Sequence, residues 1–124
     1  MEMKVALTVW ENRISPLFDC ARMLFIVDIT KNTANSRHFE PFPYKSPFSR
    51  ATKLTDIGVE VLICGAVSNL FADIIESHGI KIIPFVTGPV DEVLDAYLTN
   101  RLNDPKFRMP GCKNKLDNDF RENN

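Results

Sequence analysis

The second half of the chain alternates short apolar runs with amphipathic segments, and this alternation limits the possible folds more than any other feature. Residues 59–64 and 81–86 are short and rich in β-branched side chains, which is typical of buried strands. A helical pattern follows each run, at residues 68–79 and 87–102, and Ser68 suits the N-cap of the first helix. Strand–helix–strand alternation implies parallel strands joined by right-handed crossovers.

The first half of the chain predicts strands with a different pairing. Residues 4–9 and 23–29 are apolar and rich in branched side chains, as central strands covered on both faces should be. The polar segment TKNTAN follows the second run and predicts a hairpin turn into a weaker strand at residues 35–40. These last two strands are therefore expected to pair antiparallel.

A proline-rich connection separates the two halves. Prolines at positions 41, 43 and 47 predict an extended segment without regular structure. A short helix follows, with Ser49 as its N-cap and Gly58 as its stop. The expected element order is β-β-β-α-β-α-β-α, which predicts an α/β fold with a mixed five-stranded sheet and flanking helices.

Length and composition predict one domain in residues 1–110. The chain has 124 residues, of which 44% are hydrophobic, and this is the size and make-up of an ordinary domain with its own core. The end of the chain, KNKLDNDFRENN, is polar and has no apolar periodicity. We therefore expect residues 111–124 to form a disordered tail.

Charge and hydropathy argue against several classes of partner. The net charge of −1 lacks the excess of basic residues that nucleic-acid binding needs. No apolar run approaches the roughly 20 residues that span a bilayer, and no small-residue cleavage site follows the first apolar run. We expect no nucleic acid, no membrane and a cytoplasmic location. Three cysteines without a C-x-x-C pair are expected to be free thiols.

Two loops are expected to meet at one edge of the sheet. Residues 10–20 leave the first strand and residues 64–69 leave the fourth, and ligands of open α/β sheets usually bind in the crevice between such carboxyl ends. The helix N-terminus at residues 68–70 favours an anion, and Arg13 and Arg22 add positive charge. The sequence therefore predicts a crevice that accepts an anionic ligand.

Three segments together resemble a known family. NRISPLFDCARMLFIVDI at residues 12–29, GVEVLICGAVSNL at residues 58–70 and the closing segment that ends in FRMPGC at residue 112 occur in the order seen in the dinitrogenase iron-molybdenum cofactor biosynthesis family, of the NifX, NafY and NifB C-terminal type. The resemblance covers about residues 3–112. No single motif is diagnostic, whereas the ordered set is fairly specific.

The resemblance implies a ribonuclease H-like fold without nuclease activity. It also implies that the chain is not an enzyme but binds, carries or stores a molybdenum-containing metal–sulfur cluster or its precursor, Mo-Fe-S or Mo-Cu-S. Cofactor-assembly or acceptor proteins would then be its protein partners. Such clusters are anionic and soft, which suits thiolate ligands and backbone N–H groups that bond to sulfides.

Candidate cluster contacts follow from the crevice and the resemblance together. Many family members have histidine where this chain has Leu17, so a histidine ligand is not carried over. Cys20 replaces it if the loop forms a helical turn, because residues three apart then share a face. Cys20 and Cys112 are the predicted metal ligands. The predicted cluster-binding residues are Asn12, Arg13, Ser15, Gly65, Ala66, Ser68 and Asn69.

Each candidate also has a plain structural interpretation. Cys20 is equally well a small buried hydrophobic residue, Cys64 packs in the core, and Cys112 is an idle surface thiol. His78 complements a helix end and His38 lies on the surface.

A second function remains open on the sequence alone. The aromatic residues of segment 39–48 either cover the sheet or dock a partner, so the chain is alternatively an interaction module that has lost its cluster. An enzyme ranks third, because no nucleophile with a neighbouring base stands out.

Overall fold

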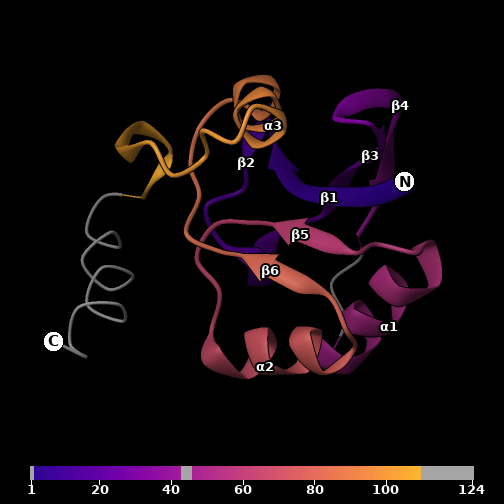
Figure 1. Ribbon diagram of the computed structural model, residues 1–124. Helices are drawn as coiled ribbons and strands as arrows, with labels where there is room; N and C mark the ends of the chain where they lie inside the picture. Colours follow the sequence, from indigo (N-terminus) through magenta and orange to yellow (C-terminus); the bar gives the residue numbers. More distant parts are fainter. Residues whose placement is uncertain (1, 43–45, 110–124) are drawn as a thin grey trace, which may run out of the picture.

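The computed structural model describes residues 2–42 and 46–109. One sheet of mixed strand direction lies at its centre, with the strand order β4-β3-β1-β5-β6 and the short β2 paired to β1 (Figure 1). The strands are β1 (Glu2–Trp10), β2 (Arg13–Ile14), β3 (Met23–Thr30), β4 (Thr33–Pro41), β5 (Val61–Ile63) and β6 (Lys81–Ile83). β1 to β4 pair antiparallel, whereas β1, β5 and β6 pair parallel. The predicted hairpin and the mixed α/β sheet are confirmed.

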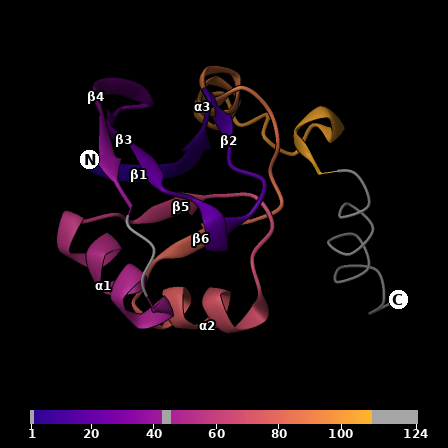
Figure 2. The ribbon, with the colours of Figure 1, turned by 180° about the vertical axis from the view of Figure 1, so that it is seen from behind.

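Helices cover both faces of the sheet, as Figures 1 and 2 show from opposite sides. α1 (Pro47–Ile57) and α2 (Asn69–Ser77) lie on one face, and α3 (Val90–Leu98) lies on the other. Two short 3-10 turns, η1 (Phe18–Cys20) and η2 (Pro105–Phe107), follow β2 and α3 along the chain. Among the described residues, no helix is long and apolar enough to cross a membrane.

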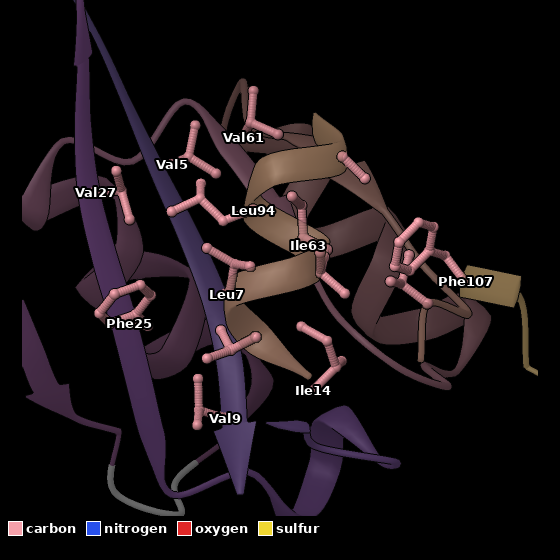
Figure 3. Close-up of a cluster of buried hydrophobic side chains, with 14 of the residues drawn as sticks. Val5, Leu7, Val9, Ile14, Phe25, Val27, Val61, Ile63, Leu94 and Phe107 are labelled. Carbon is pink, nitrogen blue, oxygen red and sulfur yellow. The ribbon is translucent and has the colours of Figure 1, made fainter. Parts of the chain in front are cut away.

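The two faces bury separate apolar clusters because successive side chains of a strand point to opposite sides. Leu7 and Val9 of β1 belong to the cluster under Leu94 of α3 (Figure 3). Ala6 belongs to the opposite cluster, together with Leu54 of α1. Each large apolar side chain buried in this way stabilises the fold by about 1.5–3 kcal/mol. β1 is therefore fixed from both faces, and its carboxyl end is a rigid base for the loop that follows.

α1 begins earlier than the sequence predicts. Its N-cap is Ser46 and not Ser49, and the amide of Ser49 donates to Oγ of Ser46 over 3.2 Å. Pro47 is the first helical residue, where no backbone N–H is needed, and Pro41 ends the edge strand β4. The prediction that these two prolines exclude regular structure is wrong. Gly58 ends the helix as predicted, in the left-handed conformation with φ 94°.

Other element boundaries also differ from the predicted ones. β5 and β6 have three residues each, and the chain continues from β6 into Pro84, which has no N–H for a ladder. α3 ends at Leu98, earlier than predicted, and β2 was not predicted. The N-cap at Ser68 is confirmed. The predicted tail at residues 111–124, with Cys112, lies outside the described residues, as do Pro43 and Tyr44.

Candidate functional site

The loops that leave β1 and β5 are joined directly by their backbones. The amide of Phe18 donates to the carbonyl oxygen of Ala66 over 2.8 Å, and the amide of Ala66 donates to the carbonyl oxygen of Pro16 over 2.8 Å. Leu17 and Ala66 thus form a parallel bridge. The two loops do meet at the carboxyl ends of the strands, as predicted. At this point, however, backbone fills the space between them.

Gly65 makes this contact possible. A Cβ atom added to Gly65 would lie 2.3 Å from the carbonyl oxygen of Ser15 and 2.5 Å from that of Pro16. Any side chain would therefore push the two loops apart. The glycine is buried beneath the loop, and the requirement for glycine here comes from close backbone approach.

Cys20 lies on the exposed end of a tight turn. The amide of Cys20 donates to the carbonyl oxygen of Leu17 over 3.2 Å, and that of Ala21 donates to Phe18 over 3.1 Å, so residues 17–21 form one 3-10 turn. Residues three apart lie above one another in such a turn. The expected helical turn is therefore present. The interpretation of Cys20 as a small buried residue is wrong, because its side chain is exposed.

Two adjoining hollows meet at Cys20. The first, of about 280 Å³, is lined by Trp10, Ser15, Pro16, Leu17 and Cys20. The second, of about 320 Å³, shares three of these residues and is also lined by Val9, Glu11, Asn12, Ala21, Arg22, Met23 and Phe39. The structure therefore brings three predicted site residues, Asn12, Ser15 and Cys20, to one surface. That surface carries both a basic and an acidic side chain, Arg22 and Glu11.

The predicted residues of the first loop have different roles around this surface. Ser15 is buried, and its hydroxyl donates to the carbonyl oxygen of Leu17 over 3.2 Å, so it stabilises the turn. Asn12 is exposed, and its carbonyl oxygen accepts from the amide of Val90 over 2.9 Å. Arg13 lies on β2, which bridges to Pro89 beside α3 (Figures 1 and 2), and it lines neither hollow.

The residues of the second loop lie beside the hollows without lining them. Ser68 accepts a hydrogen bond from the amide of Phe71 over 3.2 Å, so its hydroxyl caps α2. Asn69 is the exposed first residue of that helix. Of the described residues that line the two hollows at Cys20, none belongs to the segment from Gly65 to Asn69. A ligand at Cys20 would have to extend beyond the hollows to reach α2.

The remaining candidate ligands of the described residues, Cys64, His78 and His38, line neither hollow at Cys20. Cys64 is fully buried, and burial raises the pKa of its thiol far above the usual range, so the thiol stays protonated. Its predicted packing role is confirmed. Nδ1 of His78 contacts the carbonyl oxygen of Ile74 at 2.9 Å at the end of α2, and His38 is an exposed residue of β4. No three His, Cys, Asp or Glu side chains gather as a metal site among residues 2–42 and 46–109.

Sequence reasoning missed Arg50. This arginine of α1 is 1% exposed, and its guanidinium donates to the carbonyl oxygens of Phe18, Ala21 and Phe42. A sequence signal exists, because Arg50 precedes the buried Leu54 by four residues and therefore lies on the inner face of the helix. An arginine within the apolar face of a helix is easily interpreted as lying at the edge of that face, with its charged end in solvent.

Exposed apolar side chains surround the Cys20 hollows. Trp10 is 59% exposed, Leu17 50%, Met23 38% and Phe39 54%. Single exposed apolar residues are ordinary, whereas several around two adjoining hollows form an apolar surface. Of the predicted aromatic segment, Phe42 is buried under the sheet and Phe48 is exposed. Among the described aromatic residues of this segment, the expectation that they cover the sheet holds for the buried Phe42, whereas Phe39 and Phe48 are largely exposed.

Comparison with known proteins identifies one family. The profile described as dinitrogenase iron-molybdenum cofactor matches residues 1–100. No curated protein sequence matches the chain.

Solved structures resemble the fold at low sequence identity. The crystal structure of PH0822 superimposes with a TM-score of 0.77 at 17% identity, covering 88% of this chain and 96% of that one. The apo form of the orange protein from Desulfovibrio gigas superimposes with a TM-score of 0.67 at 19% identity, covering 80% of this chain and 89% of that one. The crystal structure of a "putative dinitrogenase" from Methanocaldococcus jannaschii superimposes with a TM-score of 0.66 at 21% identity, covering 82% of this chain and 92% of that one.

Proposed function

Because the chain belongs to the dinitrogenase iron-molybdenum cofactor family, we propose that it binds and carries a molybdenum-containing metal–sulfur cluster, or a precursor of one, without catalysing a reaction. The cluster, of Mo-Fe-S or Mo-Cu-S type, is cargo that passes to cofactor-assembly or acceptor proteins. Residues 1–110 act as one cluster-binding domain. Cys20 and Cys112 are the proposed thiolate ligands.

The observation that carries the proposal is the exposed thiol of Cys20 between two adjoining hollows. Thiolates are soft ligands that suit copper, iron and their sulfide clusters. Asn12 and Ser15 line the same surface, and Arg22 brings positive charge to an anionic cargo. Arg13, Ala66, Ser68 and Asn69 complete the proposed binding set as contacts around a cluster larger than the hollows. The buried Gly65 belongs to the set through the close backbone contact that shapes the loop beneath the cluster.

The donor set fits a preformed cluster better than a bare metal ion. A protein site for one ion usually supplies three or four ligating side chains, and the described residues offer no such group. A cluster brings its own sulfides as ligands and needs few bonds from the protein. Backbone N–H groups and an exposed thiol are then sufficient, and binding is either through the thiolate or through noncovalent contacts alone.

Loading the protein with a thiomolybdate tests the proposal. The purified chain is incubated anaerobically with tetrathiomolybdate, with and without copper or iron, and is then passed through a gel-filtration column. We expect molybdenum to elute with the protein and new charge-transfer bands to arise in the visible spectrum. Protein that elutes colourless and free of metal under all three conditions, and also after incubation with an authentic nitrogenase-cofactor precursor, would contradict cluster carriage.

A second candidate function is an interaction module that has lost its cluster. The exposed apolar side chains around Cys20 favour it, together with Leu17 at the position where many family members have histidine. Recovery of one stoichiometric partner by the metal-free chain, with metal on neither protein, would support this function. The same experiment with Trp10→Ala would then locate the partner, because Trp10 lines both hollows.

A further inference from the structure

Arg50 is a buried cation on the inner face of α1. Its side chain is 1% exposed, and its Cζ lies 4.2 Å from the ring centroid of Phe42 and 5.3 Å from that of Phe18. Both rings lie against the guanidinium, and the cation–π attraction stabilises this arrangement. A charge enclosed in this way is tolerated only if hydrogen-bond acceptors surround it. The identity of those acceptors therefore shows what the arginine does.

Among the described residues, the acceptors of Arg50 include backbone carbonyls at both ends of the Cys20 turn. Nη1 of Arg50 donates to the carbonyl oxygen of Phe18 over 2.6 Å, and Nη2 donates to that of Ala21. Phe18 is the first residue of η1, and Ala21 is its C-cap. A third bond, of 3.3 Å, runs to the carbonyl oxygen of Phe42, which directly follows β4. One side chain thus holds both ends of the turn.

Cys20 itself depends on this turn for its position. Its backbone amide donates to Leu17, and its side chain reaches the surface where the two hollows meet. The turn is attached on one side to β5 through Ala66 and on the other side to α1 through Arg50. Without the second attachment, the carbonyl of Ala21 would lose its guanidinium donor, and the carbonyl of Phe18 would keep the Ala21 amide but lose Arg50.

We propose that Arg50 is the positioning residue for the Cys20 thiol. By binding the carbonyls that flank the turn, it fixes the direction of the thiol relative to the hollows without touching the cargo. This inference rests on the proposed cluster carriage, and it extends that proposal to a residue in the core. Groups that orient a ligand by hydrogen bonding commonly change metal affinity about 10–100-fold when they are removed.

The chemistry of the side chain explains why arginine suits this position. The planar guanidinium presents several N–H donors in a fixed fork, so it can bind two carbonyls of one turn at once. A lysine keeps the charge but carries a single compact ammonium group on a flexible stem. Arg50→Lys therefore retains the charge and loses the bridge, whereas Arg50→Met retains much of the apolar stem and loses both.

Two measurements on these variants test the inference. The first is the rate at which 5,5′-dithiobis(2-nitrobenzoate) reacts with Cys20, in a Cys112→Ser background without any cluster. The buried Cys64 serves as the slow internal reference. The second is tetrathiomolybdate loading. We expect both variants to change the Cys20 rate and to weaken loading by about tenfold, the lower end of the range for groups that orient metal ligands.

A matched control separates positioning from lost stability. Val93→Ala leaves a cavity in the cluster under α3, on the face of the sheet opposite Arg50, and destabilises the fold without touching the turn. It should leave the Cys20 rate and the loading at wild-type values. If Arg50→Met does not fold, Arg50→Lys and this control still decide the question.

The outcomes distinguish this inference from the function on which it rests. Folded Arg50 variants with wild-type Cys20 rate and wild-type loading would overturn the positioning role and leave cluster carriage intact. A wild-type chain that takes up no molybdenum, while the Arg50 variants still change the Cys20 rate, would overturn cluster carriage and support Arg50 as the residue that positions the thiol.

Discussion

The backbone amide of Phe18 donates a hydrogen bond of 2.8 Å to the carbonyl oxygen of Ala66, beyond the last paired residues of β1 and β5. Ala66 returns a bond of the same length to Pro16. These bonds continue the contact between the two strands into the loops that follow them. The segment that presents Cys20 is therefore anchored to the sheet.

Gly65→Ala is expected to destabilise the protein and to displace this segment. The new Cβ would meet the carbonyl oxygens of Ser15 and Pro16 at 2.3 and 2.5 Å, and backbone cannot yield as a flexible side chain does. Overpacking of this kind costs about 1–3 kcal/mol, so urea unfolding should show a loss in that range. The reaction rate of the Cys20 thiol should change as well.

Gly79→Ala is the matched control for that variant. A Cβ at Gly79 meets nothing within 4 Å, although the backbone there has φ 83°, where a side chain is strained. This strain should cost about 1–2 kcal/mol without altering Cys20. If the Cys20 thiol reacts at the same rate in Gly65→Ala and in Gly79→Ala, the backbone contact at Gly65 does not position the turn.

Cys20→Ser should lower cluster loading while leaving stability within about 0.5 kcal/mol of wild type, because the side chain is exposed and a hydroxyl is a poor ligand for soft metals. Cys112→Ser and the double variant are compared by molybdenum content per chain after gel filtration. Unchanged loading in the double variant would show that the assignment of the two thiols as ligands is wrong.

Trp10 should report binding at Cys20 by fluorescence. It is the single tryptophan of the chain, is 59% exposed and lines both hollows with Cys20. A bound cluster that absorbs visible and near-ultraviolet light should quench its emission in proportion to molybdenum content. Molybdenum loading without quenching would place the cluster away from this surface. The same measurement on Cys20→Ser shows how much quenching occurs without the Cys20 thiol.

Ser68→Ala should weaken loading more than Ser46→Ala does. Both serines cap a helix by accepting an amide hydrogen bond of 3.2 Å, so each substitution should cost about 1 kcal/mol of stability. Only Ser68 lies at the helix N-terminus beside the Cys20 loop, in the proposed binding set. Equal loading by the two variants at matched stability would remove Ser68 from that set.

Stability should fall at alkaline pH because of Cys64. Burial raises the pKa of this thiol in the folded state, whereas the unfolded thiol titrates near its ordinary pKa of 9.0. Above that pH the unfolded chain releases a proton that the folded chain keeps, so the free energy of unfolding should drop by about 1.4 kcal/mol per pH unit. In Cys64→Ala, this contribution to the pH dependence of the free energy of unfolding should be absent when urea unfolding is measured between pH 8 and pH 10.

The sequence predicts the architecture well because burial patterns are local. The β-branched runs that became β1, β3 and β5 alternate with helices whose starts and stops are marked by residues such as Ser68 and Gly58. The misplaced start of α1 has a simple cause. Ser46 and Ser49 are both suitable caps, and only the position of Pro47 between them favours the first.

The site is less predictable because its determinants are contacts between distant segments. The pairing of Pro16 and Phe18 with Ala66 follows from how two loops meet, and no periodicity encodes it. The exposure of Cys20 depends on that pairing, so the sequence left a buried and an exposed interpretation open. Arg50 acts on a turn about thirty residues earlier in the chain, through carbonyl groups that every residue possesses.

The attachment of the Cys20 turn to both β5 and α1 has a thermodynamic consequence. A loop that is ordered only on binding loses conformational entropy at that moment, and this loss weakens the complex. Here the backbone of the turn is already fixed in the folded chain, so binding restricts little more than side chains, at about 0.5–1.5 kcal/mol each. On the proposed function, such a surface would hold a cluster with few bonds, and a cluster held by few bonds would be released readily to an acceptor that offers more.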